Sequence, residues 1–98
     1  MRMEEQIAVA VEVDEAPEEG VALGAPWFVI LFNDEIHSFD EVVLQVMKAT
    51  GCSMRRAASL TLKAHNSGQA GVYSGDIGEC VRVQAVLSEI ALRTELRG

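Results

Sequence analysis

The segment WFVILFND, residues 27–34, carries the strongest structural signal in the chain. Its first six residues form an uninterrupted apolar run rich in aromatic and β-branched side chains, which is typical of a strand buried on both faces. Asn33 and Asp34 end the run, because both residues favour turns and hydrogen-bond the backbone beside them. The segment therefore predicts a central strand that ends in a polar turn.

Two helices are predicted after this turn. Ser38 and Glu41 have the spacing of a capping box, in which the hydroxyl and the carboxylate satisfy backbone amides of the first helical turn. Apolar residues over 42–47 follow at helical spacing, and Gly51 offers the left-handed exit that ends many helices. Ser53 is the predicted cap of the second helix, whose inner stripe of small apolar residues extends to His65. We expect Gly68 to end that helix.

The rest of the chain completes one sheet. A short strand is predicted over 69–74, and a third amphipathic helix follows from Asp76 and Glu79 to about residue 90. Residues 92–97 alternate with period two, as a half-exposed edge strand does. The order β-α-α-β-α-β predicts an α+β fold in which a small three-stranded sheet carries its helices on one face. We expect residues 25–98 to form this single domain.

Residues 1–24 differ from the rest in charge. Residues 1–20 hold seven acids against one base, so they supply most of the formal net charge of −7, whereas the remainder is nearly neutral. Such a segment buries too little apolar surface to offset its ordering entropy, which predicts a flexible acidic N-terminal extension. The alternation over 7–13 leaves open a short strand formed against a partner.

Composition excludes several classes of function. A Lys/Arg stripe for binding phosphates is missing, so we expect no nucleic acid partner. The sequence contains no apolar run of 18 residues and no secretory signal, so we expect neither a membrane span nor export. Two widely separated cysteines are typical of small buried side chains in the reducing cytoplasm. Without phosphate-binding glycine loops, CxxC pairs or HExxH, we predict no cofactor and no metal.

The polar turn and one histidine are the candidate site. A carboxylate and an amide carbonyl at a strand end suit a protonated amine, which has three donors and no acceptor. A neutral ring nitrogen of His65 would add another acceptor. Ordinary turn chemistry explains Asn33 and Asp34 equally well, and a histidine near a helix C-terminus is also favoured by the helix dipole. If Val42, Thr61 and Ala64 line a hollow instead of core, the chain has an apolar pocket with a polar rim.

Several motifs in order resemble one family. They are Asn33-Asp34-Glu35 after the strand, the helix start Phe39-Asp40-x-Val42-Val43, Arg56-Ala57-x-x-Leu60-x-Leu62, His65-x-x-Gly68-x-Ala70 and Val72-Tyr73-Ser74-Gly75. Together they are similar to ClpS, the adaptor that brings N-degron substrates to Clp proteases. The resemblance implies a monomeric, non-enzymatic adaptor that docks on the N-terminal domain of a Clp ATPase of the ClpA or ClpC type.

The resemblance also implies roles for particular residues. Asn33, Asp34 and His65 match the residues that hold the α-amino group of a substrate. Its bulky first side chain, from Leu, Phe, Tyr or Trp, would enter a pocket lined by His37, Phe39, Val42, Thr61, Ala64 and Leu92. The turn around Asp76 and Glu79 matches the region that docks on the ATPase.

Three positions depart from the family pattern. Thr61 stands where Met is frequent, Glu35 where Asp is frequent, and His37 where Thr or Asn is usual. The alternative function is a bare interaction module of similar shape without an amine pocket, such as the factor-recruiting domain of the ribosomal stalk protein. An enzyme with Cys52 or Cys80 as nucleophile and a histidine as base is a third hypothesis.

Overall fold

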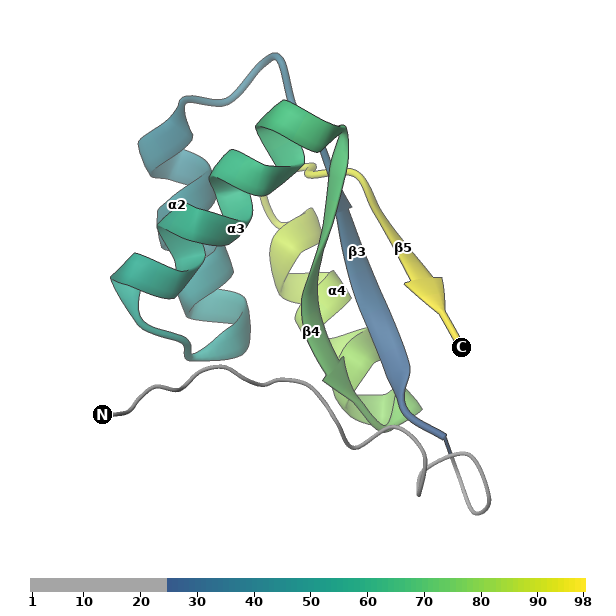
Figure 1. Ribbon diagram of the computed structural model, residues 1–98. Helices are drawn as coiled ribbons and strands as arrows, with labels where there is room; N and C mark the ends of the chain where they lie inside the picture. Colours follow the sequence, from purple (N-terminus) through teal and green to yellow (C-terminus); the bar gives the residue numbers. More distant parts are fainter. Residues whose placement is uncertain (1–24) are drawn as a thin grey trace, which may run out of the picture.

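The computed structural model describes residues 25–98, and these follow the predicted order of elements. The elements are β3 (Trp27–Phe32), α2 (Phe39–Thr50), α3 (Met54–Ser67), β4 (Gln69–Gly75), α4 (Ile77–Ser88) and β5 (Thr94–Arg97). Strand β3 lies between β4 and β5 and pairs antiparallel with both. Figure 1 shows α2 beside α3, with α4 packed behind β3 and β4. The predicted β-α-α-β-α-β fold is confirmed.

The three helices pack on one face of the sheet, and alternate side chains of β3 project into the core between them and the sheet. Val29 and Leu31 are 0% and 1% exposed and belong to a single core cluster with buried residues of all three helices. Phe28 and Ile30 point to the opposite face, since neighbouring residues of a strand project to opposite sides. Ile30 is also buried, but Trp27 and Phe28 are 37% and 38% exposed. The prediction that both faces are buried is therefore wrong at the beginning of the strand.

The helix starts are formed by the predicted caps. The hydroxyl of Ser38 accepts a hydrogen bond from the Glu41 amide at 3.1 Å, and the Glu41 carboxylate accepts from the Ser38 amide at 2.8 Å. Ser53 caps α3, and Asp76 caps α4 by accepting from the Glu79 amide at 2.8 Å. Each cap satisfies amides that have no partner within the helix. Local sequence thus fixes where all three helices begin.

The connection from α4 to β5 was predicted less accurately. The amide of Leu92 donates to the Leu87 carbonyl at 3.3 Å, and the Ala91 amide donates to the Ser88 carbonyl at 2.9 Å. This pair of bonds is a Schellman motif, which places Ala91 in the left-handed region at φ 62°. The motif turns Leu92 into the core, where it is 4% exposed. The last strand therefore begins at Thr94 and not at Leu92.

None of the three helices in residues 25–98 has the length and apolar character of a membrane span. The predicted acidic extension and the short strand over 7–13 lie outside the described residues.

Candidate functional site

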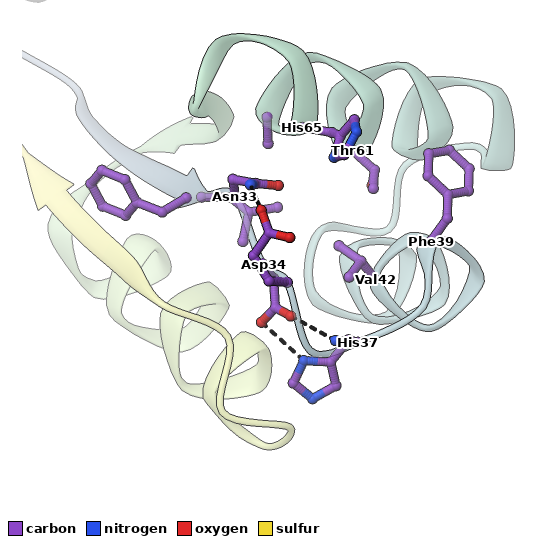
Figure 2. Close-up of a pocket in the computed structure, with 11 residues that line it drawn as sticks. Asn33, Asp34, His37, Phe39, Val42, Thr61 and His65 are labelled. Atoms are coloured by element: carbon purple, nitrogen blue, oxygen red, sulfur yellow. Dashed lines mark hydrogen bonds and ion pairs between the residues drawn. The ribbon is translucent and has the colours of Figure 1, made fainter.

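A pocket of about 330 Å³ opens where β3 ends against α2 and α3. Figure 2 shows Asn33 and Asp34 at the strand end, Thr61 and His65 on one side, and Phe39 and Val42 on another. Polar side chains and apolar side chains both contribute to the wall. The lining residues are Leu31, Phe32, Asn33, Asp34, Glu35, His37, Phe39, Val42, Thr61, Ala64 and His65.

A backbone hydrogen bond holds Asn33 beside the end of α3. The Asn33 amide donates to the Gly68 carbonyl at 3.0 Å. Gly68 ends α3 in the left-handed region at φ 92°, and its own amide donates to the Ala64 carbonyl. His65 lies in the last turn of α3, only three residues before this contact. The glycine exit of the helix therefore brings Asn33 and His65, which are 32 residues apart in sequence, to the same pocket.

Glu35 orients the side-chain amide of Asn33. The Nδ2 atom of Asn33 donates to Oε2 of Glu35 at 2.8 Å. An ionised carboxylate only accepts hydrogen bonds, so the amide nitrogen must face Glu35. The amide oxygen Oδ1 of Asn33 then points away from Glu35 and remains available to a donor. One oxygen of the Glu35 carboxylate also remains available, so this contact leaves two acceptors at the polar rim.

The carboxylate of Asp34 holds the polar turn together. Its Oδ1 accepts from the amides of Ile36 and His37, both at 2.7 Å, and its Oδ2 lies 2.9 Å from Nδ1 of His37. Figure 2 shows this carboxylate directed towards His37. Burial alone would raise the pKa of the Asp34 carboxyl, but the bonds from His37 and Ile36 bring the pKa below its ordinary value. Asp34 is therefore ionised at neutral pH, with one lone pair of Oδ2 still unused.

The apolar wall is made of short side chains. Val42, Thr61 and Ala64 are all buried and line the pocket. The Thr61 hydroxyl donates to the Ala57 carbonyl at 2.8 Å, one turn earlier in the same helix. This bond satisfies the hydroxyl, so Thr61 leaves no unpaired donor in the wall. Phe39, at the first turn of α2, is 45% exposed and lies at the mouth.

Most of the residues expected in the site line this one pocket, with Leu92 as the exception. Leu92 belongs to the core cluster because the turn after α4 directs it inward, and it does not line the pocket. Asp76 and Glu79 lie at the start of α4, outside the pocket lining. Sequence reasoning missed Leu31, Phe32 and Glu35 as lining residues. The acid next to Asn33-Asp34 was a signal for Glu35, whereas Leu31 and Phe32 look like ordinary strand residues.

The pocket is suited to a cation attached to an apolar group. Asp34 and Glu35 supply negative charge, while no lysine or arginine lines the pocket.

The described residues, 25–98, include no group of three or more His, Cys, Asp or Glu side chains that could hold a metal ion. Cys80 is buried away from the pocket, and burial raises the pKa of its thiol, which opposes formation of a nucleophilic thiolate.

These features define a small α+β domain with a pocket that has acceptors at its rim and apolar side chains in its wall. The chain belongs to the ClpS family, because the family described as ATP-dependent Clp protease adaptor protein ClpS matches residues 24–96. Membership confirms the expected resemblance. The family is one of non-catalytic adaptors.

The chain is also similar to short regions of two larger proteins and to one solved structure. Human E3 ubiquitin-protein ligase UBR2 is 28% identical over 61 residues, and Drosophila melanogaster E3 ubiquitin-protein ligase UBR1 is 29% identical over 80 residues. These regions are 62% and 81% of this chain but only 4% of each ligase. The structure of Agrobacterium tumefaciens ClpS2 bound to L-phenylalaninamide matches 74% of this chain and 94% of that chain, with TM-score 0.69 and 15% identity. At that identity, the likeness to ClpS2 concerns the fold.

Proposed function

We propose that the pocket binds the free α-amino group and the bulky apolar first side chain of a peptide, and that the protein delivers such peptides to a Clp ATPase. The observation that supports this proposal is that one cavity contains both parts of the required site. Acceptors from Asn33, Glu35 and His65 lie at its rim, and buried small side chains form its wall. As the family resemblance implies, the proposed ligand is a peptide that begins with Leu, Phe, Tyr or Trp.

The amine is assigned to the polar end. A protonated amine donates three hydrogen bonds, and the free Oδ1 of Asn33, the His65 ring and a carboxylate oxygen can accept them from different directions. Asp34 adds negative charge and holds the turn, with one lone pair left on Oδ2. Charge-assisted bonds of this kind each contribute about 1.5–3 kcal/mol before the costs of association.

The first side chain of the peptide is assigned to the apolar end. Burial of one large apolar side chain contributes roughly 1.5–3 kcal/mol. Together with the amine contacts and after association costs, this gives an affinity on the order of micromolar. The ligand of the Agrobacterium protein, L-phenylalaninamide, has both groups, a free amine and an aromatic side chain. That correspondence supports the assignment.

The partner is assigned to a separate surface. We propose that the start of α4, around Asp76 and Glu79, docks on the N-terminal domain of a ClpA- or ClpC-type ATPase and that the protein acts as a monomer in the cytoplasm. Two free cysteines support a reducing compartment. Asp76 also caps α4, and Glu79 accepts a hydrogen bond from the Tyr73 hydroxyl. The pKa of the Tyr73 hydroxyl is raised, and this bond to Glu79 is the largest of the causes.

The decisive experiment compares two peptides that differ only at the amine. A Phe-initiated peptide and its N-acetyl form are titrated into the full chain by calorimetry. We expect micromolar binding of the free peptide and a loss of at least tenfold on acetylation, because the acetyl group removes the charge and two of the donors. Equal affinity for the two peptides would contradict the proposal and favour a plain interaction module.

A further inference from the structure

The contact between His37 and Asp34 fixes the tautomer of the His37 ring. Nδ1 of His37 lies 2.9 Å from Oδ2 of Asp34, and the side chains of His37 and Asp34 are 17% and 13% exposed. The ionised Asp34 carboxylate has no hydrogen to give, so Nδ1 must carry the hydrogen of this bond. In the neutral ring, Nε2 is then the unprotonated nitrogen. A further proton can add only at Nε2, and it converts the ring into a cation.

This cation would form in the wall of the proposed amine pocket. His37 lines the pocket together with the other titratable residues Asp34, Glu35 and His65. Asp40 and Glu41 are the acids of the adjacent first turn of α2, and Glu41 is bonded to the Ser38 amide in the capping box. The ligand amine is itself a cation, so a charged His37 repels it and offsets the attraction of Asp34. Histidine changes its charge between pH 5 and 8 in proteins.

We propose that His37 has two linked roles in the pocket: its neutral ring positions the Asp34 carboxylate, and its protonation weakens binding of a peptide N-terminus. This inference rests on the proposed function and adds a dependence on pH to it. The inference depends on a ring that can both donate at Nδ1 and become charged at Nε2.

The variant His37→Asn separates the two roles. The side-chain nitrogen of Asn is bonded to Cγ, as Nδ1 of His is, so it can donate to Asp34 Oδ2 from a similar place. Asn does not titrate, so this variant keeps the positioning contact and removes the charge. His37→Leu removes both. Circular dichroism and thermal unfolding are measured for all three proteins to establish that the variants fold.

The experiment measures the dissociation constant of a Phe-initiated peptide at pH 7.0 and 5.5 for the wild type and both variants. The peptide amine remains protonated over this range. At pH 7.0 we expect His37→Leu to bind the peptide several-fold more weakly than the wild type, and also more weakly than His37→Asn, which keeps the contact to Asp34. For each protein, the dissociation constant at pH 5.5 is divided by the one at pH 7.0. This ratio should be about threefold or more larger for the wild type than for His37→Asn, because two like charges repel in the partly screened pocket. Any contribution of His65 is common to both proteins and cancels.

Three results would overturn the inference. They are equal pH ratios for the wild type and His37→Asn, equal affinities of His37→Leu and the wild type at pH 7.0, and an NMR spectrum at pH 7.5 in which the neutral His37 ring carries its hydrogen on Nε2. Failure of the proposed function looks different, because the wild type would then bind free and N-acetyl peptides equally at pH 7.0. Amine-dependent binding with unchanged pH ratios contradicts only the role of His37.

Discussion

Asp34 offers the sharpest test of how the site is built. Replacement by Ala removes the acceptor of three hydrogen bonds, from the Ile36 amide, the His37 amide and the His37 ring. Loss of one capping side chain costs about 0.5–2 kcal/mol, and bonds to a charged group lie at the upper end of ordinary hydrogen bonds. The freed amides are near the surface and regain water, so we expect a total loss of about 2 kcal/mol in the free energy of unfolding.

The variant Asp34→Asn isolates the charge from the turn. Asn retains a carbonyl oxygen that can accept from the two amides, so most of the stability should remain and the loss should stay near 1 kcal/mol or below. The negative charge beside the ligand amine is lost, however. We expect the affinity for a Phe-initiated peptide to fall at least tenfold in this variant, since a charge-assisted contribution is worth about 1.5–3 kcal/mol.

The assays are urea unfolding and calorimetric titration with the peptide. For a domain of this size, a loss of about 2 kcal/mol in Asp34→Ala corresponds to a fall in Tm of roughly 8–15 °C. If Asp34→Ala unfolds within about 0.3 kcal/mol of the wild type, Asp34 does not hold the turn. If Asp34→Asn binds the peptide within about twofold of the wild type, the charge of Asp34 does not serve the amine.

Four other predictions follow from the structure. Because the pKa of Asp34 is lowered, its stabilising contribution is present above about pH 4 and is lost as pH falls through the folded pKa, so the difference in Tm between the wild type and Asp34→Asn should shrink in acid. Thr61→Val should leave peptide affinity within about twofold, because the Thr61 hydroxyl is bonded inside its own helix, whereas Thr61→Met should weaken binding of Trp-initiated peptides more than of Leu-initiated peptides by filling the wall. Ala91→Gly should raise the free energy of unfolding by about 0.5–1 kcal/mol in urea titrations, because it relieves a left-handed residue at φ 62°. Glu79→Lys should weaken capture by the N-terminal domain of a Clp ATPase in pull-down assays and leave peptide affinity unchanged, with Asp76→Ala avoided as a probe because it removes the α4 cap.

The fold was predictable because its local signals agree with its global pattern. Ser38, Ser53 and Asp76 begin their helices through hydrogen bonds to residues three positions away, which a sequence pattern contains in full. The uninterrupted apolar run of β3 predicted a buried central strand, and Val29 and Leu31 form its core face. The errors fall where non-local packing decides. Trp27 and Phe28 resemble buried strand residues, but no helix covers them fully, and Leu92 is turned inward by a motif whose central residue is Ala instead of Gly.

The order of the elements, the three helix starts and the family pattern that includes Asn33 and His65 can all be predicted from the amino-acid sequence. It did not determine how the side chains of the polar turn pair, because contacts among neighbours in a loop depend on side-chain direction and not on spacing. The folded structure is needed to see that Asp34 faces His37, that Glu35 orients Asn33, and that the Thr61 hydroxyl is satisfied within α3. The bond from Asn33 to Gly68 likewise depends on how β3 packs beside α3, and that packing creates the pocket.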